Sequence, residues 1–319
     1  MKKIKNIIVL FLNIVLIFNF LFVFYYICDV SSCCFSKTTK IYMCHDEFKE
    51  KKLKLIGEMK ENLSLFLNRE YKGPTVSFCT TYRDRFEQIS QTLPVNLAHN
   101  RIDKENVEFV LIDFDPSDTR LKEFIFKNFS QDIQSGYLKY YQTYQMPLWD
   151  FSVAKNTAHY YASNEIVVNL DADNYTGYRG GQYVSKILDS SKNSFLWQMA
   201  DIINGSYGRI SMYKKDFDYL GGYDESLPEP AGYQDQDLID RALSYLTKIH
   251  KNSHNNSIMN EVSDKIKYTR KGKSWQEMNE INREYSQENI KNGKFQVNNG
   301  IYGIRNGVTR ILSFESEVK

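Results

Sequence analysis

The segment Ile166-Val-Val-Asn-Leu170 runs directly into Asp171-Ala-Asp173. An apolar, β-branched run of this length predicts a strand buried inside a parallel sheet. Two carboxylates at its carboxyl end stand where open α/β sheets place their ligand crevice. Carboxylates are hard oxygen ligands that suit Mg²⁺ or Mn²⁺ holding a phosphorylated substrate. Asp171 and Asp173 are therefore candidate metal ligands of an enzyme that uses a nucleotide.

The segments around this strand alternate between strand and helix patterns. This alternation predicts an α/β fold with a mostly parallel sheet, right-handed crossovers and flanking helices. The predicted strands are 76–80, 107–112 and 208–213, and the predicted helices are 86–93, 119–129, 150–162 and 235–246.

The N-terminus carries Lys2, Lys3 and Lys5 before an apolar stretch that extends from Ile7 to Ile27. About 20 apolar residues in a helix span a bilayer, whereas the apolar core of a cleaved signal has about 7–15. The lysines favour a cytoplasmic N-terminus. We expect a single-pass signal-anchor with the catalytic domain on the lumenal or extracytoplasmic side. A long cleaved signal peptide is the alternative.

Composition divides the chain into four parts. Residues 1–28 are predicted to be the cytoplasmic tip and transmembrane helix, 29–72 a charged stem, 73–250 the catalytic domain, and 251–319 a C-terminal extension with one helix. A capping box, Ser274-Trp-Gln-Glu277, begins that last helix. Trp275, Met278, Ile281 and Tyr285 recur on one face of it, which predicts that this face packs against the rest of the protein.

Charge and motif content exclude several classes of protein. The net charge is +2, so no strong field attracts nucleic acid. The chain has no G-x-x-x-x-G-K-[ST] loop and no G-x-G-x-x-G after a strand, which argues against P-loop NTPases and dehydrogenases.

Two further motifs follow the Asp171-Ala-Asp173 segment. Gly221-Gly-Tyr-Asp-Glu225 is a glycine loop whose backbone can approach a ligand closely. Gly232-Tyr-Gln-Asp-Gln-Asp-Leu238 places acids at the start of a predicted helix. Such acids act as N-caps in the simplest interpretation. In the functional interpretation, one of them is a general base that takes a proton from an attacking hydroxyl.

Tyr82-Arg-Asp-Arg85 stands at the end of the first predicted strand. Arg83 and Arg85 are candidate partners of a diphosphate, because guanidinium matches phosphate geometry. A surface pair of arginines is the alternative.

Taken in order, these motifs resemble glycosyltransferases of the GT-A fold, most nearly the β-1,4-galactosyltransferase type, and also family 2. The resemblance covers roughly residues 75–245. Tyr82-Arg-Asp-Arg85 looks like the family's nucleotide-holding Phe-Arg-Asn-Arg, and Phe151-Ser-Val-Ala-Lys155 is similar to the segment before the metal motif. Asp171-Ala-Asp173 stands in the place of that motif. Gly232–Leu238 resembles the signature Gly-Trp-Gly-Gly-Glu-Asp-Asp-Asp.

The resemblance implies a Rossmann-like GT-A domain that moves a hexose or N-acetylhexosamine from a UDP-sugar, with inversion, to a hydroxyl of a glycan, protein or lipid acceptor. It implies Asp235 as the catalytic base and Mn²⁺ (or Mg²⁺) as the cofactor. The family's third metal ligand is a histidine, for which His250 and His254 are the candidates. The implied nucleotide-sugar contacts are Arg83, Arg85, Asp113, Asp171, Tyr233 and Asp237.

Three positions depart from the family pattern. Gln234 and Gln236 stand where the family has Glu and Asp, and Val153 stands where an Arg would contact the nucleotide. Two alternatives are left open, the first of them supported by Gln234, Gln236 and the open choice between His250 and His254. One is a carbohydrate-binding or scaffold protein that kept the fold and lost catalysis. The other is a nucleotide-sugar hydrolase, in which water replaces the acceptor.

Overall fold

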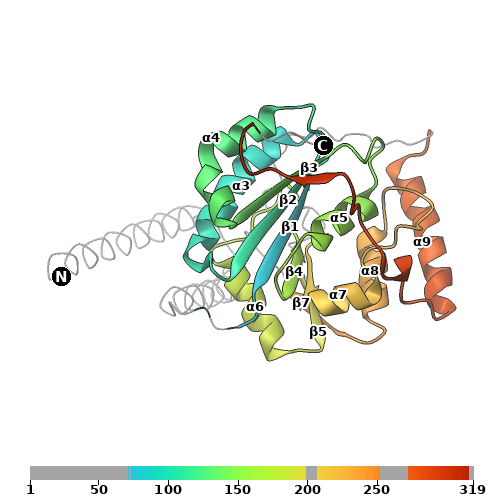
Figure 1. The fold of residues 1–319 in the computed structure, drawn as a ribbon. Helices are drawn as coiled ribbons and strands as arrows, with labels where there is room; N and C mark the ends of the chain where they lie inside the picture. Colours follow the sequence, from blue (N-terminus) through green and yellow to red (C-terminus); the bar gives the residue numbers. More distant parts are fainter. Residues whose placement is uncertain (1–70, 72, 199–206, 252–271, 316–319) are drawn as a thin grey trace, which may run out of the picture. The chain divides into compact units, whose positions relative to one another are not determined.

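A computed structural model describes residues 71, 73–198, 207–251 and 272–315 (Figure 1). The predicted anchor, 1–28, lies outside these residues, as does the predicted stem, 29–72, apart from Tyr71. No helix among the described residues is both long enough and apolar enough to cross a bilayer.

Within the described residues, eight strands form one sheet in the order β7-β5-β6-β4-β1-β2-β3-β8. The central strands β4, β1, β2 and β3 are parallel neighbours, whereas β6 and β8 are antiparallel to the strands beside them. The predicted mostly parallel sheet is therefore confirmed, with antiparallel additions. The strands are β1 Val76–Tyr82, β2 Val107–Asp113, β3 Leu138–Thr143, β4 Ile166–Asn169, β5 Ser194–Gln198, β6 Ile210–Tyr213, β7 Thr247–Lys251 and β8 Val308–Arg310.

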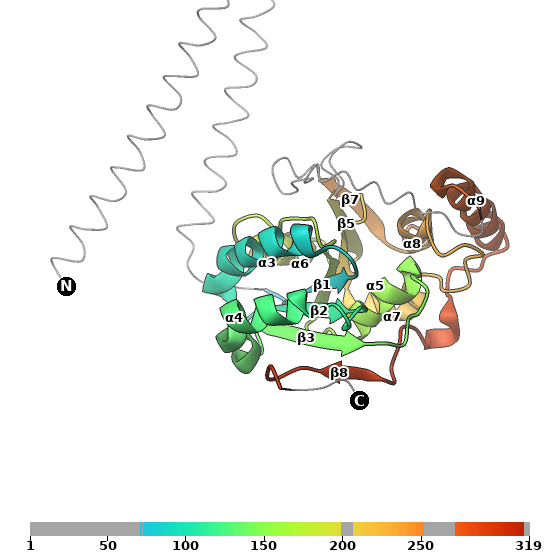
Figure 2. The same ribbon diagram turned by 90° about the horizontal axis from the view of Figure 1, so that it is seen from above.

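Helices cover both faces of the sheet, and the alternation of side chains along β1 shows why (Figures 1 and 2). Phe78 packs into the core under α3, α4 and α6, whereas Cys79 points into the opposite core under α5, α7 and α8. The helices are α3 Phe86–Asn100, α4 Arg120–Ser135, α5 Phe151–Tyr160, α6 Gly180–Ser190, α7 Lys214–Leu220, α8 Gln234–Ala242 and α9 Trp275–Lys291, with short 3₁₀ turns at Arg101–Asp103 and Asn298–Gly300.

The C-terminal part of the chain packs onto the same unit rather than apart from it. β8 extends the sheet beyond β3, and α9 packs against α8 (Figure 1). The predicted capping box is confirmed at Ser274 and Glu277. The predicted packing face is wrong in part, because Trp275 is 49% exposed while the polar Asn282 is fully buried.

Asn282 explains why a polar residue occupies the packing face of α9. Its side-chain amide donates to the carbonyl oxygens of Glu229, Ala231 and Gly232, and its Oδ1 accepts from the Glu229 backbone N–H. These contacts fix the loop that leads into α8. Gly232 has φ +85°, and a Cβ on it would lie 2.7 Å from the Cα of Asn279, so only glycine fits this approach.

The Asn282→Ala substitution should lower the free energy of unfolding by roughly 2–4 kcal/mol, because it leaves several buried backbone groups without partners. Urea unfolding of the purified chain measures this change. Glu284→Ala, on the exposed side of α9, is the matched control and should change stability by less than about 0.5 kcal/mol. Equal effects of the two substitutions would contradict this role of Asn282.

Candidate active site

The candidate site lies where the central parallel strands end together. Register aligns Tyr82, the last residue of β1, with Asp113, the last residue of β2. On the other side of β1, Asn169 of β4 pairs with Cys79. The segments that follow β1 and β4, with Arg83, Arg85, Asp171 and Asp173, therefore leave the sheet at the same edge.

The carboxylates of Asp171 and Asp173 lie in a tight turn after β4. The Asn174 backbone N–H donates to the Asp171 carbonyl at 2.9 Å. The side-chain amide of Asn169 donates to Asp171 Oδ1 at 3.1 Å, and that of Asn174 donates to Asp173 Oδ1 at 2.7 Å. Burial raises the pKa of Asp173, and the charge of Asp171 raises it further. Both amides orient the carboxylates in the manner of the outer partners of metal ligands.

Polar side chains of α3, spaced four residues apart, form hydrogen bonds with the backbone of this turn. Thr92 Oγ1 donates to the Ala172 carbonyl at 2.6 Å, and Asn96 Nδ2 donates to the Asn174 carbonyl at 2.9 Å. Asn96 Oδ1 also accepts from the Thr176 backbone N–H at 2.8 Å. These residues were not predicted, although a polar row at helical spacing on an otherwise apolar face is a signal that identifies such contacts.

Arg209, just before β6, places a positive charge close to this turn. Its Nη2 donates to Asn174 Oδ1 at 2.8 Å, and the residue is 3% exposed. Burial lowers its pKa to about 10, while the charges of Asp171 and Asp173 act in the opposite direction. Arg209 therefore remains charged at neutral pH and offsets the two carboxylates.

Asp235, the predicted base, lies in the first turn of α8 and reaches the same site. Its Oδ1 is 2.6 Å from Nζ of Lys155 on α5, and the same Nζ is 3.8 Å from Asp171 Oδ1. Burial raises the pKa of Asp235, and the Lys155 charge opposes that rise. Burial also works against the Lys155 charge, but Asp235 and Asp171 overcome it and the pKa of Lys155 is raised. The structure thus brings together the predicted base and the predicted metal motif.

Two of the predicted nucleotide-sugar contacts have other partners in this structure. Asp113 is fully buried, and it accepts hydrogen bonds from Tyr140 Oη at 2.7 Å and Gln142 Nε2 at 3.1 Å. Arg83 donates to the carbonyl oxygens of Met146 and Pro147. Arg85 is the N-cap residue of α3, and its charge opposes the raised pKa of Asp173.

Two more predicted contacts, Asp237 and Tyr233, face the helices instead. Asp237 is 1% exposed and bonds Arg241 Nε at 2.8 Å and Ser286 Oγ at 2.7 Å, which joins α8 to α9. Tyr233 has φ +67° and its hydroxyl donates to Asp240 at 3.1 Å. Their predicted contacts with the donor sugar remain predictions.

Asp171 and Asp173 form part of a donor set for a hard divalent cation. Asp171 and Asp173 supply carboxylate oxygens with amide partners, and their mutual repulsion is the kind that Mg²⁺ or Mn²⁺ relieves. No group of three or more His, Cys, Asp or Glu residues within the described part of the chain could hold a metal. His250 lies in β7 opposite Trp197, but its side chain is outside the description, and His254 is outside the described residues altogether.

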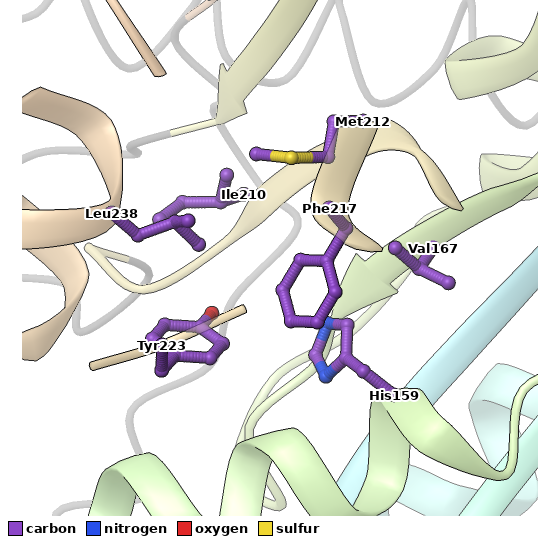
Figure 3. Close-up of a pocket in the computed structure, with 7 residues that line it drawn as sticks. All are labelled: His159, Val167, Ile210, Met212, Phe217, Tyr223 and Leu238. Atoms are coloured by element: carbon purple, nitrogen blue, oxygen red, sulfur yellow. The ribbon is translucent and has the colours of Figure 1, made fainter. Parts of the chain in front are cut away.

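A small interior pocket lies among side chains of α5, β4, β6, α7 and α8 (Figure 3). The ring of His159 stacks on Phe217 with ring centres 4.5 Å apart, and Tyr223 meets Phe217 edge-on. Burial lowers the pKa of His159 to about 3, so this histidine is neutral and structural. The pocket is lined by His159, Val167, Ile210, Met212, Phe217, Tyr223 and Leu238.

The fold was compared with known proteins. No family model and no curated protein matches the chain. Among solved structures, mannosyltransferase PcManGT from Pyrobaculum calidifontis, in complex with GDP-Man and Mn²⁺, is 15% identical, with a TM-score of 0.46 and coverage of 57% of this chain and 56% of that one. S. aureus TarS 1–349 in complex with UDP-GlcNAc is 16% identical, with a TM-score of 0.46 and coverage of 56% of each chain. GalNAc-T7 with UDP, GalNAc and Mn²⁺ is 13% identical, with a TM-score of 0.45 and coverage of 56% of this chain and 42% of that one.

The matched part of the chain thus corresponds to little more than half the length of PcManGT and TarS. Likeness at this level does not assign an activity to this chain.

The raised pKa of Asp113 should make the stability of the folded protein depend on pH. Burial raises this pKa from 3.8 to about 6. A carboxyl group with a raised folded-state pKa stabilises the fold below its unfolded pKa, and that contribution is lost as the pH rises through the folded pKa. Relative to Asp113→Asn, the native protein should lose up to about 3 kcal/mol of stability between pH 4 and pH 7.

Urea unfolding of both proteins at these two pH values measures the difference. A stability difference that stays constant with pH would contradict the ionisation of Asp113 in this interval.

Proposed function

We propose that this chain is an inverting, metal-dependent glycosyltransferase of the GT-A type that transfers a hexose or N-acetylhexosamine from a UDP-sugar to a hydroxyl acceptor. One observation carries the proposal. The Asp171-Ala-Asp173 turn and Asp235 come from distant parts of the sequence, yet a single ammonium group contacts the carboxylates of Asp171 and Asp235.

The roles follow from the contacts. Asp171 and Asp173 would hold the cation, which neutralises charge on the departing diphosphate. Asp235 accepts the proton of the acceptor hydroxyl as that oxygen attacks the sugar carbon. Its raised pKa supports this role, because burial makes the carboxylate a stronger base than an exposed aspartate. Arg83 and Arg85 stand at the end of β1, from which they would reach the nucleotide.

We also propose that residues 1–28 anchor the chain in a membrane and that the catalytic domain lies on the lumenal or extracytoplasmic side. The basic residues and the apolar stretch of the sequence support this proposal.

The proposed activity is tested with a panel of UDP-sugars and sugar acceptors, in the presence and absence of EDTA. We expect metal-dependent transfer with at least one donor. Asp235→Asn should lower kcat by roughly 10²–10⁴-fold, since the amide cannot accept the proton. Donor binding should be retained, because the Asn oxygen can still accept a hydrogen bond from Lys155. Full transfer by Asp235→Asn would rule out this residue as the base.

If the protein releases sugar at the same rate with and without acceptors, it is a hydrolase. If no UDP-sugar binds in the presence of metal, the scaffold alternative holds and the proposal fails.

The metal role is tested by calorimetric titration of UDP in the presence and absence of Mn²⁺. Asp173→Asn should remove most of the metal-dependent affinity. Even the outer partners of a metal ligand contribute roughly 10–100-fold, so the loss of a ligand should cost at least as much. The control is Asp189→Asn, an exposed carboxylate on α6. Unchanged metal-dependent UDP affinity in Asp173→Asn would contradict the assignment.

A further inference from the structure

Lys155 contacts carboxylates from both parts of the candidate site, Asp171 of the metal motif and Asp235 of α8. It lies on α5, its side chain is 5% exposed, and its Nζ is 2.6 Å from Asp235 and 3.8 Å from Asp171. Nothing in the motif pattern gave this lysine a role. A buried ammonium needs carboxylate partners, and Lys155 has two, Asp171 and Asp235.

The position of the ammonium is restricted by its surroundings. Nζ lies 5.4 Å from the centre of the Tyr223 ring, which closes the site on the interior side. On another side lies Gly208, where a Cβ would be 2.9 Å from Lys155 Nζ and 3.0 Å from Asp235 Oδ2. The missing side chain at this glycine therefore makes room for the Lys155–Asp235 pair.

Asp235 depends on this ammonium for its orientation. Its carboxylate also accepts a weak hydrogen bond from Gln234 Nε2 at 3.3 Å. The charge of Asp171 acts against the ionised form of Asp235. Without a cation between them, the two like-charged carboxylates would move apart, and Asp235 would leave the side of the site that faces the metal motif.

We propose that Lys155 is a positioning residue that holds the carboxylate of Asp235 next to the metal-side carboxylate of Asp171, with Gly208 providing the space for this pair. This inference rests on the proposed transferase function. Lys155 acts through Asp235 and does not bind the donor. Its contact with Asp235 is short. Its contact with Asp171 is longer and weaker, so it can break when the Asp171 carboxylate binds a cation.

Two variants of the full-length protein test this role. Lys155→Met keeps the volume and removes the charge, and Gly208→Ala keeps every charge and displaces the pair. Both should lower kcat by roughly 10²-fold, as expected for a misplaced catalytic group. Both should retain the affinity for UDP with Mn²⁺, since Asp171 and Asp173 are unchanged. Initial rates with saturating donor and calorimetric titration of UDP separate the two effects.

The matched control is Lys139→Met. Lys139 forms an ion pair of the same length, 2.6 Å, with Glu108, and its side chain is only 17% exposed. It lies near the amino end of β3, away from the strand ends that form the site. This variant should retain kcat even if it unfolds at a lower temperature. A thermal melt of each variant confirms that the protein is folded at the assay temperature.

The outcomes separate this inference from the proposed function. A native protein without metal-dependent donor binding or transfer overturns both. An active native protein with unchanged kcat in Lys155→Met overturns only the role of Lys155. Loss of UDP affinity in Lys155→Met would make the lysine a donor-binding residue and overturn the positioning role. Full activity in Gly208→Ala, beside an inactive Lys155→Met, would overturn only the role of Gly208 in providing space for the pair.

Discussion

Repulsion between like charges is the constraint on which the site depends. Asp171, Asp173 and Asp235 gather at one edge of the sheet, where water is partly excluded. Two unit charges about 4 Å apart interact by roughly 4 kcal/mol at the effective dielectric of a protein. That is a large part of a typical folding free energy of about 5–15 kcal/mol. Lys155 beside Asp235 and Arg209 beside the metal motif offset this repulsion, so the two buried cations are part of the fold as much as of the site.

The acids of α8 show how one helix serves both the site and the scaffold. Asp235 and Asp237 are two residues apart, so on a helix they point about 200° from each other. Asp235 therefore faces Lys155, and Asp237 faces Arg241 and Ser286 at the junction with α9. Arg241 in turn donates to the Gly222 carbonyl at 2.7 Å, which fixes the glycine loop. The packing of α9 against α8 thus helps to orient Asp235, although α9 lies about 40 residues further along the sequence.

The sequence predicted the elements whose side chains follow a clear period. β1, β2 and β4 are apolar runs buried on both faces, and α9 begins at a capping box that needs only local contacts. β3, with the sequence Leu-Lys-Tyr-Tyr-Gln-Thr, was missed because its buried polar residues interrupt the apolar pattern. α6 was missed because it starts with Gly180 and Gly181, which predict a loop. β8 is partly exposed at the edge of the sheet and carries no pattern of its own.

The same distinction applies to the site. Asp171 was predicted from its place after a buried strand and Asp235 from the resemblance, and in the structure the Lys155 ammonium contacts both carboxylates. The roles of Lys155, Arg209 and Asn96 were not predicted. Each acts on a segment distant in the sequence. The polar row of α3 marks Asn96 as a contact residue, but a single sequence does not show which distant segment a side chain contacts. Asp237 and Tyr233 were grouped with the donor site because they belong to the same motif, although a helix turns neighbouring positions toward different surroundings.

The charge balance of the site gives a physical meaning to Gln234 and Gln236, which stand where the motif that the sequence resembles has acids. Gln236 Nε2 donates to Asp240 at 2.6 Å, and its Oε1 accepts from the Tyr207 hydroxyl. Gln234 Nε2 points at Asp235. An amide donates to a neighbouring carboxylate, whereas an acid in the same place would repel it and require a further cation. These neutral neighbours add no negative charge beside Asp235, whose carboxylate lies 2.6 Å from the Lys155 ammonium. Glutamines at these two positions are therefore compatible with the proposed positioning of Asp235 by Lys155.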